Sequence, residues 1–166
     1  MEVLTKASDL RKVAAGALIA ALAAIAPAQT LDKKVLSFAA ARKMAAAAQE
    51  AAKAKGVDVV VVVVDDAGYI ILLERMDGAQ VASVQVGIGK ARTAAIYRRP
   101  SRVFEEQVRN GRVAALALAE ATPLQGGVPV LFGGKVIGAI GVSGDTPQVD
   151  EDIAIAGAKA FAQTDR

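Results

Sequence analysis

Blocks of apolar residues separated by short polar turns predict an antiparallel sheet in the middle and C-terminal parts of the chain. Residues 57–64 contain six consecutive valines, which are stiff and β-branched, and a run without alternation indicates a strand buried on both faces. The turn Asp65-Asp66-Ala67-Gly68 then predicts that residues 69–74 return as the second strand of a hairpin. Two further apolar runs within residues 126–146 flank Gly133-Gly134-Lys135 and predict another hairpin. We therefore expect residues 57–64 at the centre of the sheet.

Helices are predicted on both sides of this strand region. The first is expected to be capped by Thr30 or Asp32 and to end at Gly56. The last spans residues 147–162 and follows Thr146, which is a typical N-cap residue. The predicted apolar faces consist of Leu36, Ala40, Met44, Ala47 and Ala51 in the first helix and of Val149, Ile153, Ala156 and Ala160 in the last.

A middle helix is predicted to begin at residue 79 or 83 and to end at residue 98. It contains Gly87 and Gly89, and each glycine inside a helix costs about 1 kcal/mol relative to alanine. Gly138 and Gly141 lie inside the last predicted strand, where a side chain is normally needed for packing. These glycines predict that the helix, or a bound ligand, closely approaches the sheet.

The order of elements predicts an α+β fold with three layers, α/β/α, around an antiparallel sheet. Between the two hairpins, Ser101 is expected to cap a short helix that ends near Asn110, and residues 114–119 predict either an edge strand or a further helical turn. No repeat or linker divides the chain after its N-terminal segment. Residues 29–166 are therefore expected to form one domain.

Composition excludes several classes of function. The chain has 166 residues, of which 54% are hydrophobic and 22% charged, so it can build one core. Its net charge of +3 is spread without a basic block, which gives no case for nucleic-acid binding. The absence of cysteine excludes disulfides and thiolate chemistry, and the absence of histidine removes the commonest metal ligand and general base.

The N-terminal segment predicts export. Residues 13–26 are an unbroken apolar run of signal-peptide length preceded by Arg11 and Lys12, and Ala26-Pro27-Ala28 is a small-x-small cleavage site. Cleavage there removes residues 1–28 and makes the protein periplasmic or secreted. The alternative is an Ala-rich helical arm that packs on the domain or on a second subunit of a cytoplasmic protein, because Glu2 and Asp9 are unusual in signal peptides.

Three polar side chains share one face of the middle helix. Lys90, Thr93 and Tyr97 follow one another at spacings of three and four residues. A cation, a hydroxyl and a phenol together can bind an acidic or polar ligand. A solvated helix flank is the alternative interpretation, and the spacing alone favours it.

Two glycine-containing turns complete the candidate site. Gly126 and Gly127 open one strand, and Ser143 and Gly144 close the next, just before a helix N-terminus that can bind an anion. If Lys90 points toward both turns, an anionic ligand would lie between them. Lys90→Ala is then expected to weaken ligand binding with little effect on stability. A tight strand-to-helix turn without any ligand is the alternative.

Four motifs resemble those of the GlcG/HbpS family of small proteins. They are the D-x-x-G hairpin at residues 65–68, the G-K-A-x-T-A helix at residues 89–94, the G-G-V-P strand at residues 126–129 and the G-A-I-G-V-S-G turn at residues 138–144. They occur in the family's order, and the resemblance covers nearly all of residues 31–163. It implies a profilin-like α/β/α fold with a central antiparallel sheet of about five strands, and a tendency to form homo-oligomers.

The resemblance also implies a ligand. Part of the family binds haem or, as the second choice for this chain, a corrinoid, and some members are extracellular haem sensors that act on a membrane kinase. Because this chain has no histidine, the iron ligand stays open among Thr, Tyr, Met and Lys side chains. Haem propionates are expected to pair with Lys90, Arg75 or Arg92. Thr122 lies where some relatives use a threonine, but its surroundings differ too much to transfer that role.

Two other functions remain open from the sequence. A cofactor-free enzyme acting on a small hydroxy- or keto-acid would use Lys90 as base or Schiff-base former, with the amides of Ser143 and Gly144 binding the carboxylate. No carboxylate pair or metal cluster in the sequence supports that chemistry. The third possibility is an accessory oligomer without a small ligand.

Overall fold

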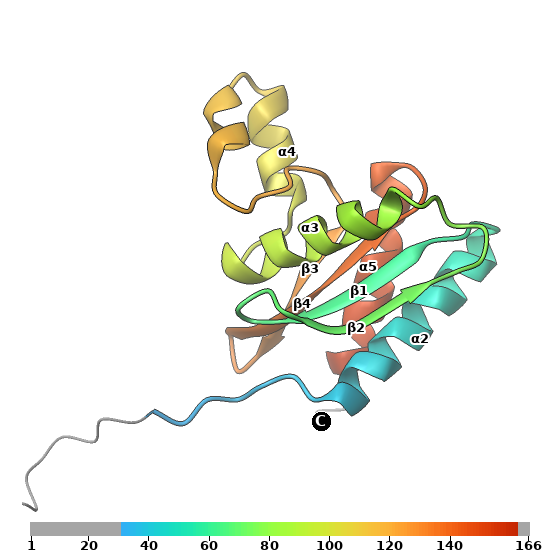
Figure 1. Cartoon of the computed structure of the whole chain (residues 1–166). Coiled ribbons are helices and arrows are strands. Elements are labelled where there is room, and N and C mark those ends of the chain that lie inside the picture. The colour runs from blue at the N-terminus through green and yellow to red at the C-terminus, as the bar shows by residue number, and fades with distance from the viewer. Residues whose placement is uncertain (1–30, 163–166) are drawn as a thin grey trace, which may run out of the picture. The chain divides into compact units, whose positions relative to one another are not determined.

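Figure 1 shows the computed structural model, which describes residues 31–162. The main folded unit begins at Lys34. In chain order its elements are α2 (Phe38–Lys55), β1 (Val60–Asp65), β2 (Ile70–Arg75), α3 (Ser83–Ile96), α4 (Arg102–Arg109), the 3-10 helix η1 (Val113–Ala117), β3 (Gly127–Phe132), β4 (Lys135–Ser143) and α5 (Pro147–Ala162). The predicted signal peptide, residues 1–28, lies outside the described residues. No described helix is both long and apolar enough to cross a bilayer.

The sheet has four antiparallel strands in the order β2-β1-β4-β3. Both predicted hairpins are confirmed, and the valine-rich β1 lies in the interior of the sheet with Val60 to Val64 fully buried. The described strands number four rather than about five. The expected alternative of an edge strand at residues 114–119 is wrong, because Val113–Ala117 forms the 3-10 helix η1.

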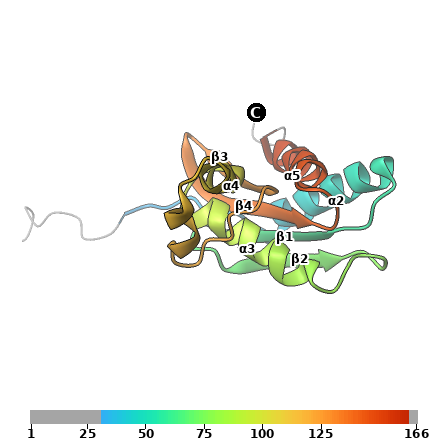
Figure 2. The ribbon, with the colours of Figure 1, turned by 90° about the horizontal axis from the view of Figure 1, so that it is seen from above.

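Alternate valines of β1 point to opposite faces of the sheet and build two separate cores. Val61 and Val63 pack in one core with residues of α2 and α5, including Met44 and Ile153. Val60, Val62 and Val64 pack in the other core with alanines of α3. Figure 2 shows α2 and α5 on one side of the sheet and α3 on the other, which confirms the predicted three-layer α/β/α architecture.

The first helix begins later than expected. Its N-cap is Ser37, whose Oγ accepts a hydrogen bond of 3.1 Å from Ala40 N, so Asp32 is not the cap. Gly56 ends the helix in the left-handed conformation with φ 70°, as predicted. The buried face is rotated relative to the predicted one and consists of Ala41, Met44, Ala45, Ala48 and Ala52.

Glycines bring α3 against the sheet and against a loop. A Cβ on Gly141 would lie 2.6 Å from Ala91 N, so β4 and α3 approach more closely than any side chain at that position would allow. A Cβ on Gly87 would lie 3.2 Å from Val62 Cγ2. The predicted close approach of the helix to the sheet is therefore confirmed. Gly89 differs, because its Cβ position is taken by the side chain of Thr122, which follows η1.

The segment between α3 and β3 folds back over the C-terminal part of α3. The rings of Tyr97 and Phe104 meet edge to face with centroids 5.0 Å apart. Ser101 precedes α4 but does not cap it through its side chain, contrary to the prediction. Its hydroxyl instead donates to Leu124 O at 2.6 Å and accepts from Gly127 N at 2.8 Å, which fixes the start of β3.

Candidate functional site

Lys90 is buried and forms an ion pair within the protein. Its side chain is 3% exposed, and Nζ lies 2.6 Å from Oδ2 of Asp150, whose side chain is 2% exposed. Nζ also donates to Val142 O at 3.1 Å. The solvated-flank interpretation is therefore wrong for Lys90, and also for Thr93, which is fully buried. Ligand binding by Lys90 stays a prediction, and it now requires that a ligand compete with Asp150.

The N-terminus of α5 already holds carboxylates of the chain. Asp150 Oδ1 accepts from Asp145 N at 3.0 Å, and Asp145 Oδ1 accepts from Thr146 N at 2.6 Å. Thr146 caps the helix as predicted, with Oγ1 3.4 Å from Val149 N. Burial raises the pKa of the Asp150 carboxyl, although Lys90 and the Asp145 amide act to lower it. The amides of Asp145 and Thr146 are thus engaged by carboxylates of the chain, whereas anion binding by the amides of Ser143 and Gly144 stays a prediction.

Gly126 and Gly127 lie against Lys90, whereas the sequence hypothesis placed an anionic ligand between them. Gly126 has φ 123°, and a Cβ there would lie 3.0 Å from Lys90 Nζ and 2.8 Å from Val142 O. A Cβ on Gly127 would overlap the carbonyl group of Lys90. Only glycine permits the loop to come this close to α3. The two glycines therefore enclose the ion pair rather than leave space beside it.

Thr93 and Tyr97 fasten a neighbouring segment to α3. Thr93 Oγ1 donates to Gly89 O and accepts from Thr122 N, both at 2.7 Å. The hydroxyl of Tyr97 donates to Ala119 O at 2.7 Å. The regular spacing of these side chains is thus used for contacts within the protein, and their predicted part in ligand binding stays a prediction.

The remaining predicted residues lie at one end of the sheet. Ser143 and Arg75 both pair with Val60, on its two sides, so they are separated by two strand spacings, about 10 Å. Ser143 is buried, and Gly144 packs its backbone against Val59. Arg75 is exposed at the edge of the sheet. The structure therefore gathers Lys90, Gly126 and Gly127 but leaves Arg75 apart from them.

A second buried acid was missed from the sequence. Glu151 is 7% exposed, and its Oε2 accepts from Gln125 Nε2 at 2.5 Å, while Oε1 lies 3.2 Å from Arg102 Nε. Burial raises the pKa of Glu151, and its bonds to Gln125 and Arg102 oppose that effect. Gln125 N also donates to Glu105 Oε2 at 2.6 Å. This network joins α4, the loop before β3 and α5.

The two acids change the assignment of the buried face of α5. The predicted face included Val149, Ile153, Ala156 and Ala160, and of these only Ile153 is buried. The buried residues are Asp150, Glu151, Ile153, Ala154 and Gly157. A break in the apolar pattern at residues 150 and 151 was the available signal, but acids in a first helical turn are usually explained by the helix dipole.

An apolar groove lies between β3 and α5. Its volume is about 280 Å³, and it is lined by Val128, Pro129, Val130, Leu131, Ile155, Ala158, Lys159, Phe161 and Ala162. Lys159 supplies the only charge among these lining residues. None of the groove residues was among the predicted site residues. Within residues 31–162 no group of three or more acidic side chains is arranged to hold a metal ion.

The chain belongs to the HbpS-like family. The family model described as "Haem degrading protein HbpS-like" matches residues 36–159, which is most of the described part of the chain. The resemblance inferred from the four sequence motifs is therefore confirmed.

Relatives of known sequence include two bacterial proteins. Protein GlcG of Escherichia coli K12 is 42% identical over 111 residues, which cover 67% of this chain and 83% of GlcG. An uncharacterized 15.0 kDa protein from the dhaT-dhaS intergenic region of Citrobacter freundii is 38% identical over 134 residues, covering 77% of this chain and 93% of that protein.

Solved structures share the fold. ORFY of Klebsiella pneumoniae has a TM-score of 0.77 at 32% identity, covering 81% of this chain and 95% of its own. A double mutant of Streptomyces reticuli HbpS has a TM-score of 0.75 at 32% identity, covering 81% of this chain and 92% of the HbpS chain. A PduOC–haem complex has a TM-score of 0.70 at 28% identity, covering 76% of this chain and 95% of the PduOC chain.

Proposed function

We propose that this protein binds haem, with a corrinoid as the second ligand class. The observation that carries the proposal is the solved PduOC–haem complex, which shares the fold over 76% of this chain at 28% identity. The matching family model is also named for haem degradation. Both concern relatives, so the ligand of this chain is an inference from them.

The groove between β3 and α5 supports part of this proposal. Its walls are aliphatic and aromatic, and Lys159 can pair with a carboxylate, which suits an apolar macrocycle that carries propionates. At about 280 Å³ the groove is near the lower limit of small-ligand sites, so a tetrapyrrole would be only partly enclosed.

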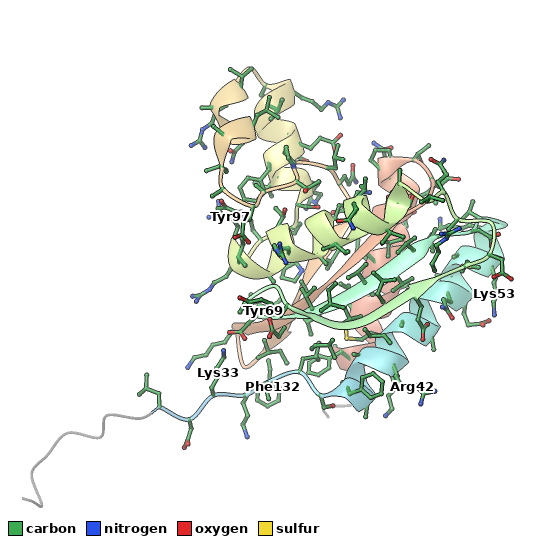
Figure 3. All side chains as sticks on the ribbon, viewed as in Figure 1. Lys33, Arg42, Lys53, Tyr69, Tyr97 and Phe132 are labelled. Atoms are coloured by element: carbon green, nitrogen blue, oxygen red, sulfur yellow. The ribbon has the colours of Figure 1, made fainter. Side chains whose placement is uncertain are left out.

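The described residues do not fit axial coordination of iron in this groove. Its lining contains no sulfur, phenol or hydroxyl group, and the chain has neither histidine nor cysteine. The one amine in the lining is that of Lys159, which this proposal assigns to a carboxylate of the ligand. Met44 is fully buried in the core, and the Tyr97 hydroxyl is bonded to Ala119 O. Tyr69, at the tip of the β1–β2 hairpin, is 69% exposed (Figure 3). We therefore propose binding through the macrocycle and its carboxylates, without a protein ligand to iron from the groove.

Titrations with haemin and with iron-free protoporphyrin IX test this proposal. Both are expected to saturate at one ligand per chain, with affinities within about threefold of each other, because the iron makes no bond to the groove. Lys159→Ala should weaken binding of both ligands by about fivefold, the range for an exposed ion pair, while Lys135→Ala at the start of β4 should not. A non-saturating haemin titration would overturn haem binding itself. Tight haemin binding without porphyrin binding would instead show that iron has a protein ligand elsewhere.

We also propose that the protein acts outside the cytoplasm, where a membrane sensor protein is a candidate partner. The support is the apolar run at residues 13–26 followed by Ala26-Pro27-Ala28. Intact-mass measurement of protein from the exported fraction should give a chain that begins at Gln29. An exported chain that retains Met1 would contradict cleavage.

A further inference from the structure

Apolar and basic side chains gather at one end of the molecule. Phe38 and Arg42 are four residues apart on α2 and therefore share a face of this helix. Leu36, just before α2, packs over β4, because a Cβ on Gly138 would lie 3.0 Å from Leu36 Cδ2. This contact places the start of α2 beside the end of the sheet that carries the β3–β4 turn. Figure 3 shows Arg42 of α2 and Phe132 of β3 at this same end of the molecule.

Several apolar side chains at this end are exposed. Phe38 is 57% exposed and Phe132 is 36% exposed, and neither of them lines the groove between β3 and α5. Phenylalanine is among the residues most often buried, so two exposed rings at one end of a small protein indicate an interaction surface. We call this surface the basic apolar end and define it by the exposed residues Lys34, Val35, Phe38, Arg42, Leu131, Phe132 and Lys135.

The basic apolar end carries a positive charge. Residues 34–49 and 128–140, which supply this surface, contain four basic side chains and no acid. The β1–β2 turn, residues 65–68, adds two acids near this end, so the balance stays positive, with four basic side chains against two acids. The acidic first turn of α5 lies at the opposite end of α2, where Asp152 pairs with Lys55. The charge of the molecule is therefore unevenly distributed, and this end is suited to an anionic partner.

We propose that the basic apolar end docks on an anionic membrane surface. Its lysine and arginine side chains pair with lipid phosphates, and the phenylalanine rings between them enter the boundary of headgroups and acyl chains. A protein partner fits this surface less well, because lysine is depleted at protein–protein interfaces and hot spots are rich in tryptophan, tyrosine and arginine. The proposal does not depend on the identity of the ligand, since the residues tested below lie outside the groove lining.

Co-sedimentation with lipid vesicles tests the charge. Protein from the exported fraction should bind vesicles that contain about one third phosphatidylglycerol, and should bind pure phosphatidylcholine at least about tenfold more weakly. Arg42→Gln and Lys135→Gln should each lower the affinity about fivefold, while Lys53→Gln, in the last turn of α2, should not. Parent and variants carry the same N-terminus, so any contribution from residues 13–26 cancels between them. Equal binding to both lipids, or equal affinities of Arg42→Gln and Lys53→Gln, would overturn the proposal.

A tryptophan reporter tests insertion of the apolar side chains. The chain has no tryptophan, so Phe132→Trp introduces a single one, and Val113→Trp is the control because Val113 is 65% exposed on η1. Anionic vesicles should shift the emission of Phe132→Trp to shorter wavelength and leave that of Val113→Trp unchanged, since only the first ring leaves water. A shift in both reporters would contradict docking through this end. If neither reporter shifts while Arg42→Gln still weakens binding, the surface binds polyanions such as an acidic protein by charge alone, and the membrane proposal fails.

Discussion

Replacing Lys90 with methionine is expected to destabilise the fold by about 3–5 kcal/mol, because the Asp150 carboxylate would stay buried without its cation. The sequence alone predicted little effect of Lys90→Ala on stability, and burial of the pair reverses that expectation. Methionine keeps most of the buried volume, so the loss reports on the charge and its hydrogen bonds. After the change, Asp150 Oδ1 keeps the hydrogen bond from the Asp145 amide, whereas Asp150 Oδ2 loses its bond to Lys90 and Val142 O loses a donor.

Urea unfolding at pH 7, followed by circular dichroism, measures this effect. With a slope of about 2 kcal/mol per molar urea, the midpoint should fall by roughly 2 M. Lys53→Met is the matched control, because Lys53 pairs with Glu50 at the surface and should change stability by less than about 0.5 kcal/mol. Lys90→Met combined with Asp150→Asn should recover part of the loss, because neither charge of this pair then remains. A loss for Lys90→Met no larger than that of Lys53→Met would refute the reasoning.

Three further substitutions probe the same region. Burial raises the pKa of Glu151 above its usual 4.5, so the contribution of Glu151 to stability is present below pH 4.5 and is lost as pH rises through the folded-state pKa. In urea unfolding, the free energy of unfolding of Glu151→Gln should therefore rise relative to that of the parent between pH 4.5 and 7. A difference that does not change with pH would contradict this. Gly141→Val should lower the free energy of unfolding by about 3 kcal/mol or abolish folding, because Ala91 occupies the space that the new side chain needs. A thermal melt equal to that of the parent would disprove the close approach of α3 to β4. Thr93→Val should lower the free energy of unfolding by about 1–3 kcal/mol because Thr122 N loses its acceptor, whereas Thr93→Ser keeps a hydroxyl acceptor for it. Equal urea midpoints for the two variants would argue against the hydrogen bond between Thr122 N and Thr93 Oγ1.

Strands and turns were predictable from the sequence because their signals are local. Consecutive valines specify a buried strand, and the Gly133-Gly134 turn specifies the second hairpin, with both glycines at positive φ. The face of α2 was not predictable in the same way. Alanine occupies both the buried positions and several exposed ones in that helix, so hydrophobicity could not distinguish its faces. Packing against α5 and the sheet makes that choice instead.

The candidate site was predictable as a group of residues but not as a set of contacts. The sequence grouped Lys90 with Gly126 and Gly127 as neighbours of a bound anion, and the structure brings both glycines against Lys90. The partner of Lys90 was hidden, because Asp150 lies 60 residues away and resembles an ordinary acid of a first helical turn. Of the three consecutive acids, only Asp152 is exposed, where it pairs with Lys55. Burial of the other two follows from tertiary packing, which a local pattern does not encode.

The ion pair between Lys90 and Asp150 also bears on how the molecule unfolds. α3 and α5 cover opposite faces of the sheet, so this bond passes around the end of the sheet and connects its two otherwise separate cores. Detaching either helix would leave the charge on the other helix without its buried partner. Opening of one core is thereby linked to opening of the other, and slow-exchanging amides of α3 and α5 should share a single opening free energy in native-state hydrogen exchange. The two cores on either side of the sheet should therefore open together as one cooperative unit.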